Sequence, residues 1–153
     1  MIQLKNPSRH VIIEAHKDVY KYMIDQGWDK KSGVEIIFGR WQDVIDDVGC
    51  FDAVFFDTFG EYYDDLKEFH ENITNLLIDD NAVYSFFNGL AGTNSFFHDV
   101  YNQVAAADLF EMGIETEYID IEVAKLGDEL WKRTARAYYS LPMYQLPICQ
   151  LMQ

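Results

Sequence analysis

The chain has 153 residues, 49% hydrophobic and 16% aromatic, which predicts one folded domain over residues 1–153 and excludes a disordered chain. It has no apolar run near the ~20 residues that span a bilayer and no leader sequence, so we expect a soluble intracellular protein. Cys50 and Cys149 lack the spacing typical of a metal site or a disulfide framework. Asp and Glu outnumber Lys and Arg by 26 to 12, and the net charge of −14 argues against non-specific nucleic-acid binding while permitting a basic partner.

The first third of the chain alternates short apolar runs with amphipathic stretches. The β-branched run Val11–Ile13 predicts a buried strand that ends at Glu14, and residues 18–26 predict a helix that stops at Gly27. Residues 34–38 predict a second strand. Gly39 follows it, and then comes a short helix with apolar positions at Trp41, Val44, Ile45 and Val48.

The remaining elements continue this alternation. Residues 51–56 predict a third strand closed by Asp57, residues 63–78 a helix, and residues 82–87 a fourth strand after a turn at 79–81. Asn94 or Ser95 is expected to cap a long helix that runs to about Met112, with Gly113 as its stop. Residues 114–123 and 135–141 predict a final antiparallel pair, joined by a polar segment with Gly127 and Asp128.

Strands that alternate with helices predict an α/β fold with a mostly parallel sheet covered by helices on both faces. In such sheets ligands bind beyond the carboxyl ends of the strands. The residues that follow each strand are therefore the candidates for a site, and they occupy positions 14–16, 39–42, 57–58 and 88–92.

Two candidates are suited to a nucleoside. Glu14 follows a strand, where a carboxylate can accept both hydroxyls of a ribose, although a charged residue also commonly just ends a strand. Trp41 follows the next strand, where an indole can lie against an adenine, and packing at the start of its own helix is the simpler alternative.

Asp57 is the candidate for a cationic ligand. Its carboxylate follows an apolar, aromatic strand and can hold a guanidinium through two hydrogen bonds, or alternatively cap the next turn. Residues 88–92 (Asn-Gly-Leu-Ala-Gly) are a poor match to a phosphate-binding loop and favour an ordinary turn. His10, His70 and His98 show no spacing typical of a metal site.

Three stretches taken together are more specific than any single residue. They are Val-Ile-Ile-Glu-Ala-His at 11–16, Gly-Arg-Trp-Gln-Asp-Val at 39–44 and Phe-Phe-Asp-Thr-Phe at 55–59. They closely resemble the fungal protein-arginine δ-N-methyltransferases (type IV), and less closely the guanidinoacetate N-methyltransferases. Ser-Phe-Phe-Asn-Gly-Leu at 85–90 and the tail at 138–147 extend this resemblance over nearly the whole chain.

The resemblance implies a Rossmann-like class I fold, S-adenosyl-L-methionine as methyl donor, and arginine residues of a protein, in particular a ribosomal protein, as acceptors. It implies that Glu14, Ala15 and His16 contact ribose and adenine and that Trp41 and Gln42 border the adenine. Asp57 would contact the methionine moiety and act as the catalytic residue toward the guanidine. The resemblance also implies a monomer when complete, located in the cytoplasm and nucleus.

One departure from the family concerns its first strand and its Gly-rich loop of the form GFGxG. Residues 1–6 resemble the end of the helix that follows this loop, so we expect an N-terminally truncated domain. The missing strand would lie between the strands of Ile12 and Val54, and exposed edges on both would favour marginal stability or self-association. The alternatives are therefore a non-catalytic or fragmentary methyltransferase-like binding module, or an enzyme that methylates a small guanidino acid.

Overall fold

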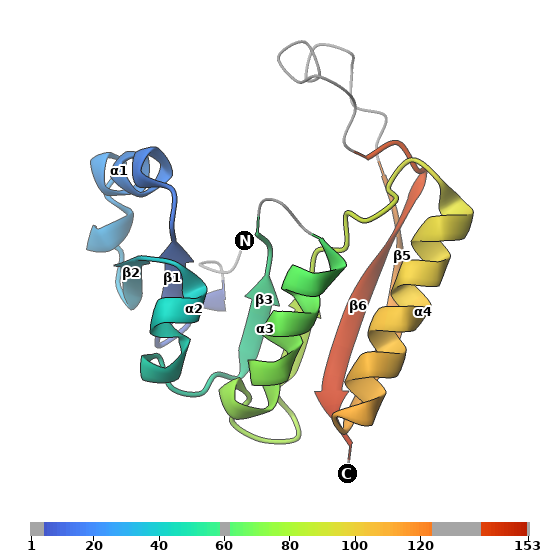
Figure 1. Cartoon of the computed structure of the whole chain (residues 1–153). Coiled ribbons are helices and arrows are strands. Elements are labelled where there is room, and N and C mark those ends of the chain that lie inside the picture. Colours follow the sequence, from blue (N-terminus) through green and yellow to red (C-terminus); the bar gives the residue numbers. More distant parts are fainter. Residues whose placement is uncertain (1–4, 59–61, 124–138, 153) are drawn as a thin grey trace. The chain divides into compact units, whose positions relative to one another are not determined.

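The computed structural model describes residues 5–58, 62–123 and 139–152, and its chain divides into two compact units, Met1–Gly49 and Cys50–Gln153 (Figure 1). The described strands form one sheet in each unit, with the order β1-β2 in the first and β3-β4-β6-β5 in the second. No strand pairing joins the two sheets in the described ranges. The single domain over residues 1–153 stays a prediction, and the predicted helix end at residues 1–6 falls mostly on residues 1–4, outside the described ones.

The first unit is a β-α-β arrangement whose two strands are parallel. Its elements are β1 (His10–Glu14), α1 (Lys17–Asp25), a 3-10 helix (Trp28–Lys30), β2 (Val34–Phe38), α2 (Trp41–Val44) and a 3-10 helix (Ile45–Asp47). The strands pair in register from His10 opposite Val34 to Glu14 opposite Phe38. Gly27, with φ of 70°, ends the α1 segment in a conformation that glycine adopts without strain. The predicted strands and helices of this unit are thus confirmed.

One arginine, near the start of the first unit, forms a hydrogen bond and a salt bridge with later segments of that unit. The Arg9 guanidinium donates to the Val48 carbonyl oxygen at 2.6 Å and forms a salt bridge with Glu35 at 3.0 Å. Both charged side chains are about half exposed, so the ion pair contributes roughly 1 kcal/mol at most. Among the described residues of this unit only Ile45 and Val48 are buried, which leaves it with a small core.

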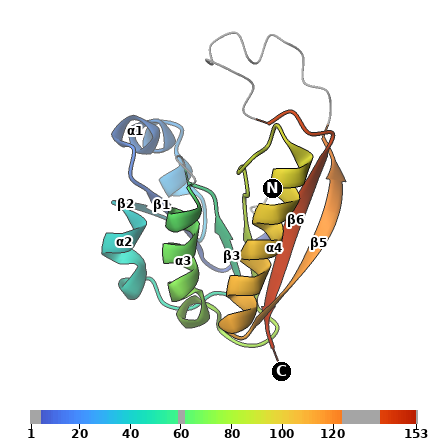
Figure 2. The ribbon, with the colours of Figure 1, turned by 45° about the vertical axis from the view of Figure 1, so that its right-hand side comes forward.

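The second unit is a mixed sheet with its two helices on one face. Its elements are β3 (Ala53–Phe56), α3 (Tyr63–Leu76), β4 (Val83–Phe86), α4 (Ser95–Glu111), β5 (Ile114–Glu122) and β6 (Met143–Leu151). Strands β3 and β4 are parallel, whereas β6 is antiparallel to both β4 and β5. Figure 2 shows α3 and α4 on the same side of this sheet.

The core of the second unit lies between these helices and the sheet. Tyr84 and Phe86 of β4 are fully buried, and the rings of Phe69 and His70 of α3 pack against them. Burying an aromatic side chain of this size stabilises a fold by about 1.5–3 kcal/mol. On α4, the apolar side chains of Ala105 and Leu109 are fully buried.

Helix α4 begins and ends as its sequence predicts. The Asn94 side chain accepts a hydrogen bond from the Phe97 backbone N–H at 3.2 Å, which caps the helix. Gly113, with φ of 82°, follows the last turn. None of the helices in the described part of the chain has the length and apolar character needed to cross a membrane.

The last strand differs from the prediction. The strand expected at residues 135–141 is wrong for residues 139–141, which are irregular, and residues 135–138 lie outside the described ranges. The partner of β5 is instead β6, residues 143–151, although the predicted antiparallel pairing is confirmed. Pro147 argues against a strand in the sequence because proline has no N–H, but the structure places it within β6, opposite Tyr118 of β5.

No described helix of this unit covers the second face of the sheet. Phe55 on β3 and Ile119 and Ile121 on β5 are 55%, 52% and 42% exposed. Sheets with parallel strands usually have both faces covered. Among the described residues, strand β3 pairs only with β4.

Candidate functional site

The carboxyl ends of β1 and β2 bring the nucleoside candidates of the first unit to one edge. Glu14 is the last residue of β1, opposite Phe38 at the end of β2. The Gly39 backbone N–H donates to the Glu14 carbonyl oxygen at 3.1 Å, which fixes the start of the segment that leads into α2. The structure therefore places residues 14–16 and 39–42 at the same edge, where ligands bind in this class of sheet.

The carboxylate of Glu14 has a defined orientation. Its Oε1 atom accepts a hydrogen bond from the His16 backbone N–H at 2.6 Å. A carboxylate has about four lone-pair positions, so this contact leaves capacity for hydroxyl donors. Glu14 is half-buried, whereas Ala15 and His16 are exposed at the start of α1. The geometry suits a ligand with neighbouring hydroxyl groups.

Trp41 and Gln42 are the first two residues of α2, and both are half-buried. Arg40 precedes them in an extended backbone conformation, and the first helical turn begins at Trp41. A partly exposed indole at this edge offers an aromatic face to a planar ring. Their contacts with adenine stay predictions.

In the second unit, Asp57 lies at the equivalent edge. It follows Phe56 at the end of β3, and the Phe87 N–H donates to the Phe56 carbonyl oxygen at 2.9 Å. Asp57 is exposed and adjoins the segment 87–92 that follows β4. A carboxylate placed there is accessible from solvent, and its contact with a cationic ligand stays a prediction.

A buried polar network holds the loop 88–92, which the sequence favours as an ordinary turn. The Asn88 amide donates to the Asn102 side-chain oxygen, and the Asn102 amide donates to the Gln145 side chain at 2.6 Å. The Tyr144 hydroxyl donates to the Phe86 carbonyl oxygen at 3.1 Å and accepts from the Asn88 N–H at 3.2 Å. These contacts come from β4, α4 and β6, so the loop is fixed by the whole unit.

His98 also anchors this loop. Its ring is buried, its Nδ1 lies 2.8 Å from the Leu90 carbonyl oxygen, and Tyr139 packs edge-on against it. In the sequence, a loop-anchoring role is indicated by a polar residue at a core-facing position of α4. His98 and Asn102 both occupy such positions. Sequence patterns do not identify either residue, because their partners lie in other elements, eight or more residues away.

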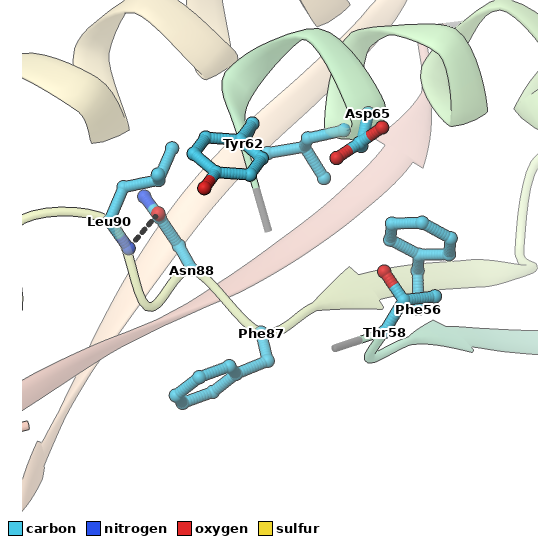
Figure 3. Close-up of a pocket in the computed structure, with 8 residues that line it drawn as sticks. Phe56, Thr58, Tyr62, Asp65, Phe87, Asn88 and Leu90 are labelled. Atoms are coloured by element: carbon cyan, nitrogen blue, oxygen red, sulfur yellow. Dashed lines mark hydrogen bonds between the residues drawn. The ribbon is translucent and has the colours of Figure 1, made fainter. Parts of the chain in front are cut away.

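A small pocket opens beside this loop (Figure 3). Its lining comes from the end of β3 and the residues after it, the start of α3 with its N-cap, and the segment after β4: Phe56, Thr58, Tyr62, Asp65, Leu66, Phe87, Asn88 and Leu90. No sequence pattern singles out Tyr62 or Asp65 as a site residue. One weak feature of the sequence distinguishes Asp65: it directly precedes Leu66, a core position, and so lies at the border of the buried face of α3.

Two further titratable groups are buried without serving the site. Burial lowers the pKa of His70 to about 4, and burial raises the pKa of Cys149 to about 11. Both side chains are therefore neutral near pH 7 and pack in the core. Across residues 5–58, 62–123 and 139–152, no group of three His, Cys, Asp or Glu side chains is arranged to hold a metal ion.

Known proteins similar in sequence share one name. The chain is 41% identical over 155 residues to "Protein arginine N-methyltransferase 2" of Aspergillus oryzae and 36% identical over 152 residues to the protein of that name in Saccharomyces cerevisiae. These alignments cover 99% and 95% of the chain but only 37% and 36% of the relatives. The chain thus spans about a third of their length. No protein-family model matches the chain.

Several solved structures with similar folds are named as methyltransferases. Precorrin-6y C5,15-methyltransferase from Geobacter metallireducens has a TM-score of 0.64 at 16% identity, over 93% of this chain and 67% of that one. A methyltransferase from Pyrococcus furiosus has a TM-score of 0.59 at 10% identity, over 94% and 62%. At these identities the likeness establishes the fold. The chain has the Rossmann-like fold of class I S-adenosylmethionine-dependent methyltransferases. In sequence it is homologous to a segment that makes up about a third of the length of the fungal protein arginine N-methyltransferases.

Proposed function

We propose that this chain is part of a methyltransferase that transfers a methyl group from S-adenosylmethionine to the δ-nitrogen of arginine residues in a protein. The observation that carries the proposal is the 41% identity, over 99% of the chain, to a protein named as an arginine N-methyltransferase. The fold supports the same reaction class. The δ-nitrogen follows from the resemblance of residues 11–16, 39–44 and 55–59 to the type IV enzymes.

In this proposal the first unit binds the nucleoside part of the cofactor. Glu14 accepts the ribose hydroxyls with the lone pairs that the His16 N–H leaves available. Residues 15 and 16, together with Trp41 and Gln42, border the adenine. The cofactor, when bound, supplies an electrophilic methyl group on a sulfonium sulfur. An edge that presents an oriented carboxylate and a half-buried indole fits such a ligand.

Asp57 is proposed to orient the acceptor guanidinium. A guanidinium is a poor nucleophile because its lone pairs are delocalised and its pKa exceeds ~12. A carboxylate that holds two of its nitrogens directs the third toward the methyl group, and it accepts one of the guanidinium protons as the new bond forms. Positioning of this kind contributes as much as roughly 7–11 kcal/mol in favourable intramolecular reactions.

The proposed acceptor is a basic protein, with a ribosomal protein as the first candidate. The chain's net charge of −14 attracts a cationic partner over long range. Methylation of a small guanidino acid and a purely binding role are the competing functions. The resemblance of residues 14–16 and 40–42 favours the protein-arginine group over the small-molecule enzymes.

A transfer assay with identification of the product tests the proposal. The chain is incubated with radiolabelled S-adenosylmethionine and either an arginine-rich ribosomal protein or guanidinoacetate, and the methylated amino acid is identified after hydrolysis. We expect δ-N-methylarginine in the protein and no labelled guanidino acid, with turnover lost in Asp57→Ala and kept in Asp52→Ala. Label in guanidinoacetate alone, or normal turnover by Asp57→Ala, would contradict the assignment.

A further inference from the structure

Helix α4 has an apolar outer side in addition to the side that packs on the sheet. Phe97, Val100 and Val104 are 53%, 42% and 40% exposed, and Ala107 is exposed as well. Their spacing of three and four residues places these four side chains on one line along the helix, the outer stripe of α4. A helix with one buried side normally presents polar residues to solvent, so the outer stripe is a candidate contact surface.

The sheet-facing side of α4 has the opposite composition. His98 and Asn102 are fully buried there, with His98 Nδ1 at 2.8 Å from the Leu90 carbonyl oxygen and the Asn102 amide at 2.6 Å from Gln145. A rotation of the helix that buried the outer stripe would break these hydrogen bonds. The stripe therefore stays on the outside of the second unit, and it belongs to that one compact body.

The surroundings of the outer stripe are acidic. Lys67 is the only Lys or Arg between residues 50 and 123, against 16 Asp and Glu residues. Its Nζ atom lies 3.5 Å from the carboxylate of Asp108 on α4, so its charge is already engaged. Asp64 and Glu71 on the neighbouring helix α3 are exposed. The field around the stripe therefore favours a cationic partner.

Negative charge is concentrated at the C-terminal end of the stripe. Glu111 is exposed and lies four residues after Ala107, in line with the stripe. The last turn of α4 contains no basic residue, although the carbonyl groups at a helix C-terminus carry partial negative charge and favour a cation. A positive group from a partner would supply the charge that α4 itself lacks there.

This combination of features decides between the possible occupants. A second copy of the chain would bring its own acidic surroundings against the stripe, at a net charge of −14 for each copy. A helix with apolar residues on one side and lysine or arginine beside them matches both parts of the surface. We propose that the outer stripe is a docking surface for a basic amphipathic helix of a partner protein. The apolar side of that helix packs on Phe97, Val100 and Val104, and its cations lie beside Glu111.

The docking surface is separate from the edge proposed for catalysis. Asp57 follows β3 at the end of the sheet where α4 begins, whereas Glu111 lies at the opposite end of α4 (Figure 1). A helix of 17 residues is roughly 25 Å long. Lysine serves such a surface as well as arginine does, so the partner need not be a methyl acceptor.

NMR titration of the ¹⁵N-labelled 153-residue chain with arginine-free peptides tests the proposal. The probe is a short helical peptide of leucine and lysine with its leucines on one side. Its controls are a scrambled peptide of the same composition and a helix with glutamate in place of lysine. We expect the leucine–lysine helix to shift the amide signals of residues 97–111, the scrambled peptide to bind at least severalfold more weakly, and the glutamate peptide to have no effect. Equal affinity for the scrambled peptide, or shifts confined to residues outside α4, would overturn the proposal.

Phe97→Ala is the decisive variant, and Phe110→Ala is its matched control. Both remove an exposed phenylalanine ring from α4, but Phe110 lies roughly a third of a turn around the helix from the stripe. We expect Phe97→Ala to weaken binding of the leucine–lysine helix by roughly tenfold, the scale of burying about half of an aromatic side chain, and Phe110→Ala by less than about twofold. Equal losses would refute a role specific to the stripe. Circular dichroism confirms that both variants are folded.

A second pair of variants tests the charged end and does not depend on the folding of Phe97→Ala. Glu111→Gln should weaken binding by about threefold, whereas Asp99→Asn, an exposed carboxylate on another side of α4, should leave the affinity unchanged. Equal affinities in these two variants would contradict the placement of the cations.

Sedimentation velocity separates the proposed partner from a second copy of the chain. Phe97→Ala should leave the sedimentation of the chain unchanged, and a shift toward the monomer would assign the stripe to a second copy and overturn the proposal. The peptides contain no arginine and the titration uses no cofactor, so the outcome is independent of the proposed methyl transfer.

Discussion

The buried network around Asn102 makes the sharpest prediction on stability. Asn102 is fully buried, accepts from the Asn88 amide and donates to Gln145 at 2.6 Å. Asn102→Ala leaves one donor and one acceptor without partners, and each costs about 1–3 kcal/mol when buried. With the small cavity added, we expect the free energy of unfolding to fall by about 3 kcal/mol. For a chain of this length that lowers Tm by roughly 6–12 °C.

The control lies one residue further along α4. Gln103 is exposed, so Gln103→Ala should change the free energy of unfolding by about 0.5 kcal/mol or less. Urea unfolding followed by circular dichroism measures both variants, and NMR of the folded state should show displaced signals for residues 88–92 in Asn102→Ala only. If Asn102→Ala is no less stable than Gln103→Ala, the network does not hold the loop and the reasoning fails.

Three further predictions concern other parts of the fold. Because burial lowers the pKa of His70 to about 4 from its usual 6.5, the folded state binds fewer protons than the unfolded state, and stability should fall by about 3 kcal/mol as the pH drops from 6.5 to 4. His70→Phe should flatten that part of the pH profile in urea unfolding, and an unchanged slope would contradict the assignment. Asn94→Ala should cost about 1 kcal/mol and Asn94→Gly only a few tenths, because glycine is tolerated at a helix N-cap; equal losses in thermal melts would argue against the cap. The edge of β3 that pairs with no described strand and the exposed Phe55 should make the chain self-associate. Phe55→Lys should shift sedimentation velocity toward the monomer, and a wild-type monomer at all concentrations would refute this expectation.

Most elements could be predicted because local patterns determine them. The β-branched run before Glu14, the helical spacing between residues 63 and 78, and the cap at Asn94 each depend on residues within a few positions. The last strand could not be predicted in this way. Its nine pairs with β5 form across a long stretch of chain, and Pro147 within it opposes strand formation locally.

The candidate site was predictable in part for the same reason. Glu14 and Asp57 directly follow strands, and the topology of parallel strands places such residues at one edge. By contrast, the half-burial of Asp65 and the pairing of Asn88 with Asn102 depend on how α3 and α4 pack on the sheet. No spacing within the sequence encodes those contacts, so they became visible only in the folded chain.

The most direct test of the central claim is a calorimetric titration of the folded 153-residue chain with S-adenosylhomocysteine. The account predicts one-to-one binding that Glu14→Gln weakens by about tenfold, the loss expected when a charged hydrogen-bond acceptor is removed. Asp18→Asn, an exposed carboxylate in the first turn of α1, should leave the affinity unchanged. An absence of binding, or equal affinity in the wild type and Glu14→Gln, would contradict the assignment of the cofactor edge.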